Sequence, residues 1–184
     1  MNKNKTPTLS EDYIAGFTDG EGCFDLQFRR DVRHERLNKP AYYAWKCQFV
    51  IVARDDDEEL MRKIRDKLGR GSINFSRGDQ VRYSVQDIDS LYDIIVPFFR
   101  KYPLSGKKNK DFELWAEAIE IIRRNKRKTM NVKTGFKGFT KTSWNKQDFL
   151  RLIEIQKLMQ EYKSKRPQGF KWVSVAESIA KTLK

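Results

Sequence analysis

The stretch YIAGFTDGEG, from Tyr13 to Gly22, decides the fold of this 184-residue chain, because small residues and acids recur in it at helical spacing. We expect a helix over residues 8–20 that begins with a capping box formed by Thr8 and Glu11. Gly22 is placed to end this helix.

The expected helix has two faces of different chemistry. Tyr13, Ile14 and Phe17 form an apolar stripe, whereas the other side is small and almost flat. Small residues let a second backbone approach closely. If two such helices pack together, the contact residues are expected to be Ala15, Gly16, Asp19 and Gly20.

Two acids, Asp19 and Glu21, lie between glycines at the end of the expected helix. The last carbonyls of a helix have no partner within it, and the negative end of the helix dipole lies there. Carboxylates, carbonyls and negative potential together suit a hard divalent cation that keeps several waters. The plainer interpretation is a glycine-rich helix end with incidental acids.

Downstream of the helix, the hydrophobic pattern changes to period two. Residues 23–31 and 42–53 alternate apolar and polar side chains, which is typical of half-buried strands, with a polar loop over 32–40 between them. Five acids at 55–59 then precede an amphipathic helix that Gly69 ends. Acids are favoured in a first helical turn, so we interpret this run structurally and assign it no metal.

The order of elements predicts an α+β fold: helix, two strands, helix, two strands, helices, with one four-stranded antiparallel sheet. We expect a single domain over residues 1–184, with its core at 8–125 and a C-terminal helical extension at 126–184. The remaining elements are expected as strands at 71–77 and 80–86, helices at 88–100, 110–125 and 146–163, and a weak segment at 172–183.

Helices must cover one face of the sheet, and the other face is rich in polar side chains. Arginine, glutamine, asparagine and aspartate can hydrogen-bond the edges of bases in the major groove. An open face of this kind can also be merely solvated. The candidate DNA-binding residues are Asp25, Gln27, Arg29, Asp31, Lys46, Gln48, Asn74, Ser76, Arg77, Arg82 and Ser84.

The net charge of +13 is unevenly distributed. Residues 1–100 carry 17 basic and 17 acidic side chains, whereas residues 101–184 carry 21 basic and 8 acidic ones. Residues 121–147 hold nine lysines and arginines, no acid, and the aromatics Phe136, Phe139 and Trp144. This asymmetry favours a nucleic-acid partner over a basic surface that is merely solvated.

Several classes of protein are excluded by composition. No apolar run approaches 18 residues, so we expect no membrane partner, and the polar N-terminus lacks the apolar core of a secretory signal. Two cysteines and one histidine, His34, give neither a disulfide framework nor a Cys/His metal cluster. We also expect no small-molecule cofactor, and an intracellular location.

Residues Ile14 to Gly22, IAGFTDGEG, resemble the LAGLIDADG signature of homing endonucleases and related intron maturases. They keep its alanine, its first glycine, both acidic positions and its final glycine. The later segments DDDEELMRKIRDKLGRGSI and PFFRKYPLSGKKNKDFELW are similar to the family as well. The resemblance covers about residues 8–125 and, more loosely, the helix near 146–163.

The resemblance implies a metal site at the end of the signature helix. In the family these helices pack in pairs, and the second acid of each binds Mg²⁺ beside a scissile phosphate. Glu21 is therefore the implied metal ligand, with the carbonyl of Gly20 as a helper and Asp19 as a secondary candidate. Mg²⁺ is the implied cofactor, and Mn²⁺ or Ca²⁺ can occupy such a site.

The resemblance also implies a basic residue that helps to order solvent and stabilise charge during cleavage. Lys107 matches this residue best, and Lys108 is adjacent to it. Many family members have a glutamine at the end of the second strand, within the catalytic water network. This chain has Ala53 followed by Arg54 there.

From the resemblance we expect a homing endonuclease of the single-motif type. It would act as a homodimer, making a staggered double-strand break by Mg²⁺-dependent hydrolysis at a long, approximately palindromic DNA site, and so promote intron or intein mobility. The alternative is an intron maturase, or a nucleic-acid-binding protein of the same fold that does not cut. Such proteins occur in mitochondria, chloroplasts, and prokaryotic or archaeal cytoplasm.

Overall fold

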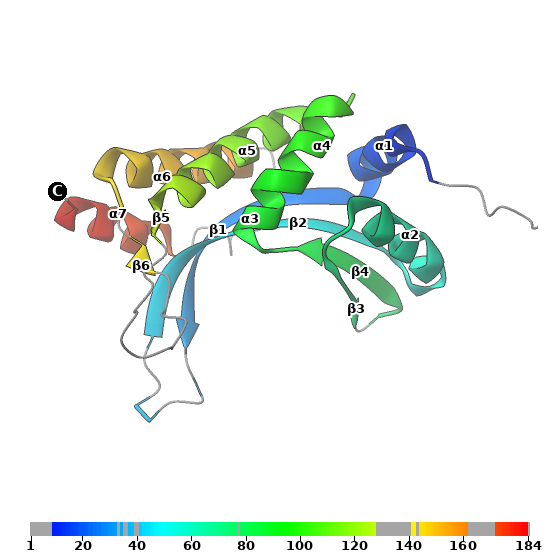
Figure 1. The fold of residues 1–184 in the computed structure, drawn as a ribbon. Helices are drawn as coiled ribbons and strands as arrows, with labels where there is room; N and C mark the ends of the chain where they lie inside the picture. The colour runs from blue at the N-terminus through cyan, green and yellow to red at the C-terminus, as the bar shows by residue number, and fades with distance from the viewer. Residues whose placement is uncertain are drawn as a thin grey trace, which may run out of the picture. The chain divides into compact units, whose positions relative to one another are not determined.

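The computed structural model describes residues 9–32, 34, 37–38, 41–76, 78–127, 141–142, 144–161 and 172–183. Its elements follow the predicted order, and the α+β prediction is confirmed (Figure 1). The helical elements are α1 (Glu11–Glu21), η1 (Asp55–Asp57), α2 (Glu58–Leu68), α3 (Ile88–Ser90), η2 (Leu91–Ile95), α4 (Val96–Lys101), α5 (Lys108–Asn125), α6 (Lys146–Glu161) and α7 (Val173–Thr182). The strands are β1 (Gly22–Val32), β2 (Ala41–Arg54), β3 (Ser72–Ser76), β4 (Gln80–Val85), β5 (Lys126–Arg127) and β6 (Lys141–Thr142).

The main sheet has four strands in the order β1-β2-β4-β3. Strand β4 pairs antiparallel with both β2 and β3, so that Val50 and Ser72 both lie opposite Ser84. A second sheet, formed by the short β5 and β6, was not predicted. Two-residue strands carry too little alternation to be recognised from a sequence.

Helix α1 differs from its prediction in both its cap and its buried face. The hydroxyl of Ser10 accepts a hydrogen bond from the amide of Tyr13 at 3.2 Å, so Ser10 is the N-cap; Thr8 lies outside the described residues. The buried residues are Ile14, Ala15 and Thr18, whereas the exposed fraction of Tyr13 is 46%. The predicted stripe of Tyr13, Ile14 and Phe17 is therefore wrong as a core face.

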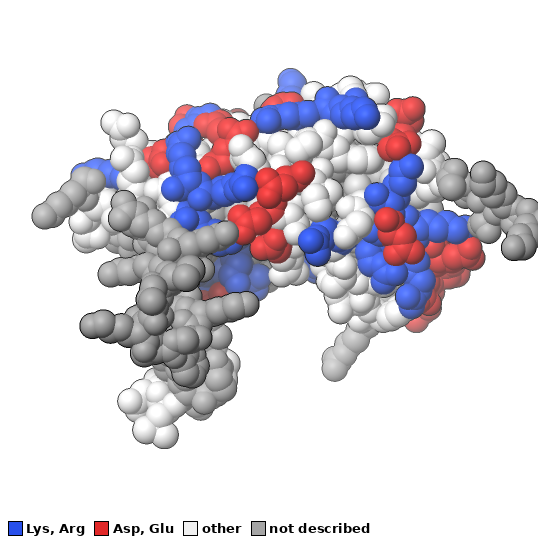
Figure 2. All heavy atoms as spheres, viewed as in Figure 1, with Lys and Arg blue, Asp and Glu red and all other residues white. Residues whose placement is uncertain are grey.

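The amphipathic helix after the five acids is confirmed as α2. Gly69 ends it in the left-handed conformation (φ 71°), which glycine adopts without steric cost. Glu59 pairs with Lys63 one turn later at 2.8 Å, and Glu58 pairs with Arg62. Figure 2 shows acidic and basic side chains next to one another in the region of α2. The acids therefore have a structural explanation.

The chain divides into two compact units whose residues alternate along the sequence: residues 1–25 with 48–113, and residues 26–47 with 114–184. We call them unit 1 and unit 2. Neither coincides with the predicted core at 8–125 or extension at 126–184, so that division stays a prediction. Among the described residues, no helix is long and apolar enough to cross a membrane.

The core of unit 1 is aromatic. The ring of Phe24 lies 5.4 Å from the rings of Phe49 and Phe99 and 5.3 Å from the ring of Phe112, centroid to centroid. Because Phe24 lies three residues after Glu21, this cluster anchors β1 just beyond the end of α1. Within unit 1, α1, α2 and α4 lie on one side of the sheet (Figure 1).

Unit 2 has its own aromatic core, in which Phe28, Trp45 and Phe149 meet at centroid distances of 5.1–5.8 Å. Arg124 at the end of α5 pairs with Asp148 in the first turn of α6, with Nε donating to Oδ2 at 2.8 Å. The nearly buried Asn125 also donates to Asp148, at 2.7 Å. These contacts fix the start of α6 against the end of α5.

Candidate active site

Glu21 ends α1, and its side chain is exposed. The next residue, Gly22, already belongs to β1, and its amide donates to the carbonyl of Thr18. A Cβ at Gly22 would lie 2.4 Å from Thr18 Cγ2 and 2.7 Å from the Thr18 carbonyl oxygen. Only glycine therefore fits this junction, and Glu21 is held directly between a helix and a strand.

Asp19 faces a loop of its own unit. Its Oδ2 accepts hydrogen bonds from the amides of Ser105 and Gly106 at 2.7 and 3.0 Å. A Cβ at Gly106 would lie 3.1 Å from Asp19 Oδ1, which is buried and has no hydrogen-bond partner in the structure. Asp19 thus holds the loop that leads into α5. Local sequence does not indicate Ser105 and Gly106 as its partners, because they lie 86 and 87 positions further along the chain.

Lys108 brings the first turn of α5 to the end of α1. Its ammonium nitrogen donates to the carbonyl oxygen of Gly20 at 2.6 Å and to that of Thr18 at 3.1 Å. Burial lowers the pKa of Lys108. Negative charges nearby, among them those of Asp19 and Glu21, act in the opposite direction and raise this pKa. The structure therefore places a positive charge on one of the carbonyls that were predicted to help bind metal.

Lys107, the preferred candidate, is exposed and is not the lysine that contacts these carbonyls. The choice between the two lysines depends on where the loop ends and α5 begins. That boundary is set by the contacts of Asp19 with the loop, which a reading of local sequence does not include. Lys107 stays the predicted basic residue of the site, and the contact with the carbonyls brings its neighbour Lys108 forward as a second candidate.

The donors gathered here are oxygens: the carboxylate of Glu21 and the carbonyl of Gly20 at the negative end of α1. That chemistry fits a hard divalent cation such as Mg²⁺, and the position of the Lys108 ammonium shows that it attracts positive charge. Within the described residues, no three histidine, cysteine, aspartate or glutamate side chains could hold a metal by themselves. A bound metal would therefore need further oxygen ligands from water, substrate or a second chain.

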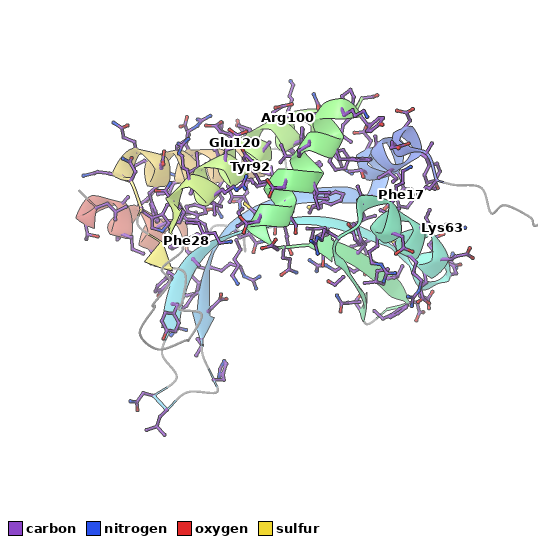
Figure 3. The ribbon with its side chains drawn as sticks, in the orientation of Figure 1. Phe17, Phe28, Lys63, Tyr92, Arg100 and Glu120 are labelled. Carbon is purple, nitrogen blue, oxygen red and sulfur yellow. The ribbon has the colours of Figure 1, made fainter. Side chains whose placement is uncertain are left out.

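The predicted contact face of α1 is only partly exposed. Ala15 is 6% exposed and Asp19 is bonded within its own unit, so the part that these two residues take in a contact between helices stays a prediction. Gly16 and Gly20 are exposed, and a Cβ built at either would meet no atom within 4 Å. Tyr13 and Phe17 stack at 6.0 Å beside them, and Figure 3 labels Phe17 on α1. The outer face of α1 is thus made of Tyr13, Gly16, Phe17 and Gly20.

On the sheet face of unit 1, three predicted DNA-binding side chains form one network. Gln48 Nε2 donates to Asp25 Oδ2 at 2.8 Å, and an Arg82 guanidinium nitrogen donates to Gln48 Oε1 at 3.0 Å. Arg82 lies opposite Val52 in the register, so its side chain must extend past Val50 to reach Gln48. The network fixes which end of the Gln48 amide faces each neighbour.

The other candidates in unit 1 differ in their exposure. Asn74 and Ser76 are exposed, and Asn74 donates to the hydroxyl of Ser72 at 3.3 Å. Ser84 is only 3% exposed, so it offers little surface to DNA in this structure, and its role stays a prediction. It lies between Val50 and Ser72, along the strip beside which Arg82 extends. Arg77 lies outside the described residues.

In unit 2, Arg29 is exposed and Gln27 is half-buried. Lys46 and Asp31, two further candidates, form an ion pair with each other at 3.0 Å.

The remaining sequence candidates lie partly beyond what the structure describes. At the end of β2, Ala53 is half-buried opposite Val81, and Arg54 pairs with Asp56 at 3.0 Å. Of the aromatics in the basic stretch, Trp144 packs against Phe149 at 5.4 Å, whereas Phe136 and Phe139 lie outside the described residues.

Comparisons with known proteins match this chain to a family, to curated relatives and to solved structures. A family model described as LAGLIDADG endonuclease matches residues 14–119. The chain is 33% identical over 111 residues to "Probable intron-encoded endonuclease 3" of Neurospora crassa, covering 60% of this chain and 20% of that protein. It is 31% identical over 117 residues to "Uncharacterized 50.9 kDa protein in ND4 intron 1" of Podospora anserina, covering 63% of this chain and 25% of that protein. The chain therefore spans a fifth to a quarter of the length of these two relatives.

Solved structures share the fold. The homing endonuclease I-TnaI is 22% identical with a TM-score of 0.67, covering 95% of this chain and 99% of that one. The LAGLIDADG meganuclease I-AabMI, solved bound to uncleaved DNA, is 28% identical with a TM-score of 0.56, covering 80% of this chain and 43% of that one.

Proposed function

The chain belongs to the LAGLIDADG endonuclease family, and from that premise we propose that it is a site-specific DNA endonuclease that hydrolyses phosphodiester bonds with Mg²⁺. The observation that supports this most strongly is the end of α1, where Glu21 is exposed, the Gly20 carbonyl attracts a cation and Lys108 is already in place. Loss of the second acid would have favoured a protein that binds without cutting, whereas this chain keeps Glu21.

Each residue of the site has a separate task in the proposed reaction. Glu21 and the carbonyl of Gly20 would hold the metal ion. Bound there, it would activate a water and stabilise the leaving 3′-oxygen. Lys108 supplies positive charge next to the scissile phosphate, where negative charge develops. Asp19 acts through the loop, because its bonds to Ser105 and Gly106 set where Lys108 begins its helix.

The sheet face of unit 1 would read bases through the network of Asp25, Gln48 and Arg82. A guanidinium can donate two hydrogen bonds to the O6 and N7 of guanine, and its orientation decides which base it meets. Gln48 holds Arg82 in one orientation and is itself held by Asp25. Exposed Asn74 offers a further contact to bases.

A second copy of the chain would complete the enzyme. The sequence holds one signature helix, and its outer face of Tyr13, Gly16, Phe17 and Gly20 leaves open space at both glycines. Packing two such faces around a twofold axis brings two Glu21 side chains to one duplex, one for each strand. The expected product is a staggered break at an approximately palindromic site.

The biological role that follows is intron homing. The relatives are named as intron-encoded proteins, one of them in an ND4 intron. We propose that this chain has a similar origin and acts in an organelle.

The decisive experiment is cleavage of a randomised duplex DNA library with Mg²⁺. An endonuclease of the proposed kind leaves a defined sequence enriched at the cut ends, and the Glu21→Gln variant leaves none. Selective binding to DNA or RNA without cleavage by the wild type would instead identify a non-cutting binder or a maturase.

A further inference from the structure

We propose that the ammonium group of Lys108 occupies the cation position of the active site in the DNA-free protein, and that DNA binding withdraws it and so admits the metal ion. Metal and DNA binding are then coupled through one side chain. This inference rests on the proposed function, because it concerns the same site.

The first support is the contact itself. Lys108 Nζ lies 2.6 Å from the carbonyl oxygen of Gly20 and 3.1 Å from that of Thr18. Both oxygens lie near the C-terminal end of α1, where the helix dipole is negative. The carboxylates of Asp19, Glu21 and Asp111 add attraction for positive charge. The site thus already carries a cation, and the cation is part of the protein.

The second support is that two cations cannot share this carbonyl comfortably. Mg²⁺ binds oxygen at about 2.0–2.1 Å, and Lys108 Nζ already lies 2.6 Å from the same Gly20 oxygen. A metal ion on that oxygen would lie close to the ammonium in a partly buried place, where like charges are poorly screened. The ammonium therefore opposes a metal ion on this oxygen, and the opposition ends when Lys108 moves away.

The third support is that the side chain can move while its backbone stays. The loop before α5 is held by Asp19 through two amides, so the Cα of Lys108 is fixed. A lysine side chain is a flexible four-carbon stem with a compact charge, and Lys108 is only half-buried. A phosphate placed beside Glu21 offers the ammonium a stronger anionic partner than a carbonyl does.

The consequence is a mutual dependence of the two ligands. DNA that draws Lys108 from Gly20 raises the affinity for metal, and by linkage the metal raises the affinity for DNA by the same factor. The free protein binds metal weakly for this reason, and the site becomes competent when the substrate is present.

The test measures Mn²⁺ binding to the DNA-free protein by electron paramagnetic resonance. We compare the wild type with Lys108→Met and with Lys107→Met, which removes the same charge from the exposed neighbouring residue. We expect Lys108→Met to bind Mn²⁺ at least about tenfold more tightly, and Lys107→Met to bind like the wild type. Adding Glu21→Gln to Lys108→Met should remove the gain, which assigns it to this site.

Circular dichroism establishes that each variant is folded. Should Lys108→Met fail to fold, Lys108→Gln answers the same question, because its amide can still donate to Gly20 without the charge. A folded neutral variant that binds Mn²⁺ no more tightly than the wild type, or a gain equal in Lys107→Met, would overturn the proposal. These arms contain no DNA, so their outcome is independent of whether the wild type cleaves any target.

Discussion

Glu21 is the residue on which the proposed chemistry depends most directly. Replacing it with glutamine keeps the volume and removes the charge that holds the metal. We expect cleavage by Glu21→Gln to fall at least about a hundredfold, with DNA affinity nearly unchanged, because affinity comes mostly from phosphate and base contacts. Single-turnover cleavage and a binding titration in Ca²⁺ measure the two quantities separately. Near-normal cleavage by this variant would disprove the site assignment.

Lys107 and Lys108 provide a matched pair at the same scale. Lys108→Ala should slow the cleavage step by about 10²–10³ and weaken DNA binding by less, because its charge acts beside the reacting phosphate. Lys107→Ala should change cleavage little, since its side chain is exposed and is not the one at the Gly20 carbonyl. Rates at saturating DNA distinguish the two. Equal losses would mean that both lysines merely clamp the backbone of the DNA.

The sequence predicted Glu21 and Gly20 at the end of a helix, but it did not indicate that Lys108, and not Lys107, contacts the Gly20 carbonyl. Local pattern determines the first pair, because both residues belong to one helix end. The lysines depend on a contact between Asp19 and the loop at residues 105–106, far away in the sequence. Likewise, Ser84 occupies a polar position in the alternating pattern of its strand, where an exposed residue is expected. Nothing in the sequence of that strand indicates that Ser84 is buried beside the long side chain of Arg82.

At the scale of elements, hydrophobic period identified nearly every helix and strand, because half-buried elements must alternate at 2 or 3.6 residues. In helix α1, however, the hydrophobic pattern did not indicate which face is buried. Its buried face is made of Ile14, Ala15 and Thr18, while two large aromatics, Tyr13 and Phe17, lie on the other side. A reading by hydrophobicity assigns aromatics to the core. The proposed contact with a second copy of α1 would account for the opposite arrangement.

The network between β1, β2 and β4 predicts that Gln48 and Arg82 act as a unit in base reading. Gln48→Ala and Arg82→Ala should each relax the preference at the same position of each half-site. Their effects on binding should be non-additive, with a coupling of about 0.5–3 kcal/mol. A double-mutant cycle on target and single-base variants measures this, with Asn74→Ala as the control outside the pair. Strict additivity would show that the network carries no specificity.

The junction of α5 and α6 in unit 2 predicts a dependence of stability on pH. The Arg124 guanidinium lowers the pKa of Asp148, and the Asn125 amide lowers it further. A carboxyl with a lowered pKa when folded stabilises the protein above its unfolded pKa of about 4, and this contribution is lost as the pH falls through the folded pKa. Urea unfolding from pH 7 to pH 3 should therefore show a smaller acid loss in Asp148→Asn than in the wild type. If the free energy of unfolding fell equally with pH in both proteins, Asp148 would be excluded as a source of acid sensitivity.

At the scale of the whole molecule, the question is assembly. Leucine at position 16 meets open space within the chain and suits a helix better than glycine by roughly 0.5–1 kcal/mol. Gly16→Leu should therefore fold at least as stably as the wild type, yet it should dimerise and cleave poorly, because the bulk keeps two helices apart. Light scattering and thermal unfolding check both halves of this expectation. A Gly16→Leu protein that remained a fully active dimer would place the partner surface elsewhere.

Helix α1 passes directly into β1 at Gly22, without a loop between them. This direct connection would set the distance along the DNA between the cut and the bases that β1 contacts. Asp25, in the proposed base-reading network, lies four positions after Glu21, which would hold the metal. At about 3.3 Å per extended residue, they lie no more than about 13 Å apart along the strand, which spans roughly four base pairs at 3.4 Å each. The covalent geometry of the chain would thus set the distance between the cut and the nearest base that this network contacts. An inserted residue at this junction should move the cut relative to the recognised bases.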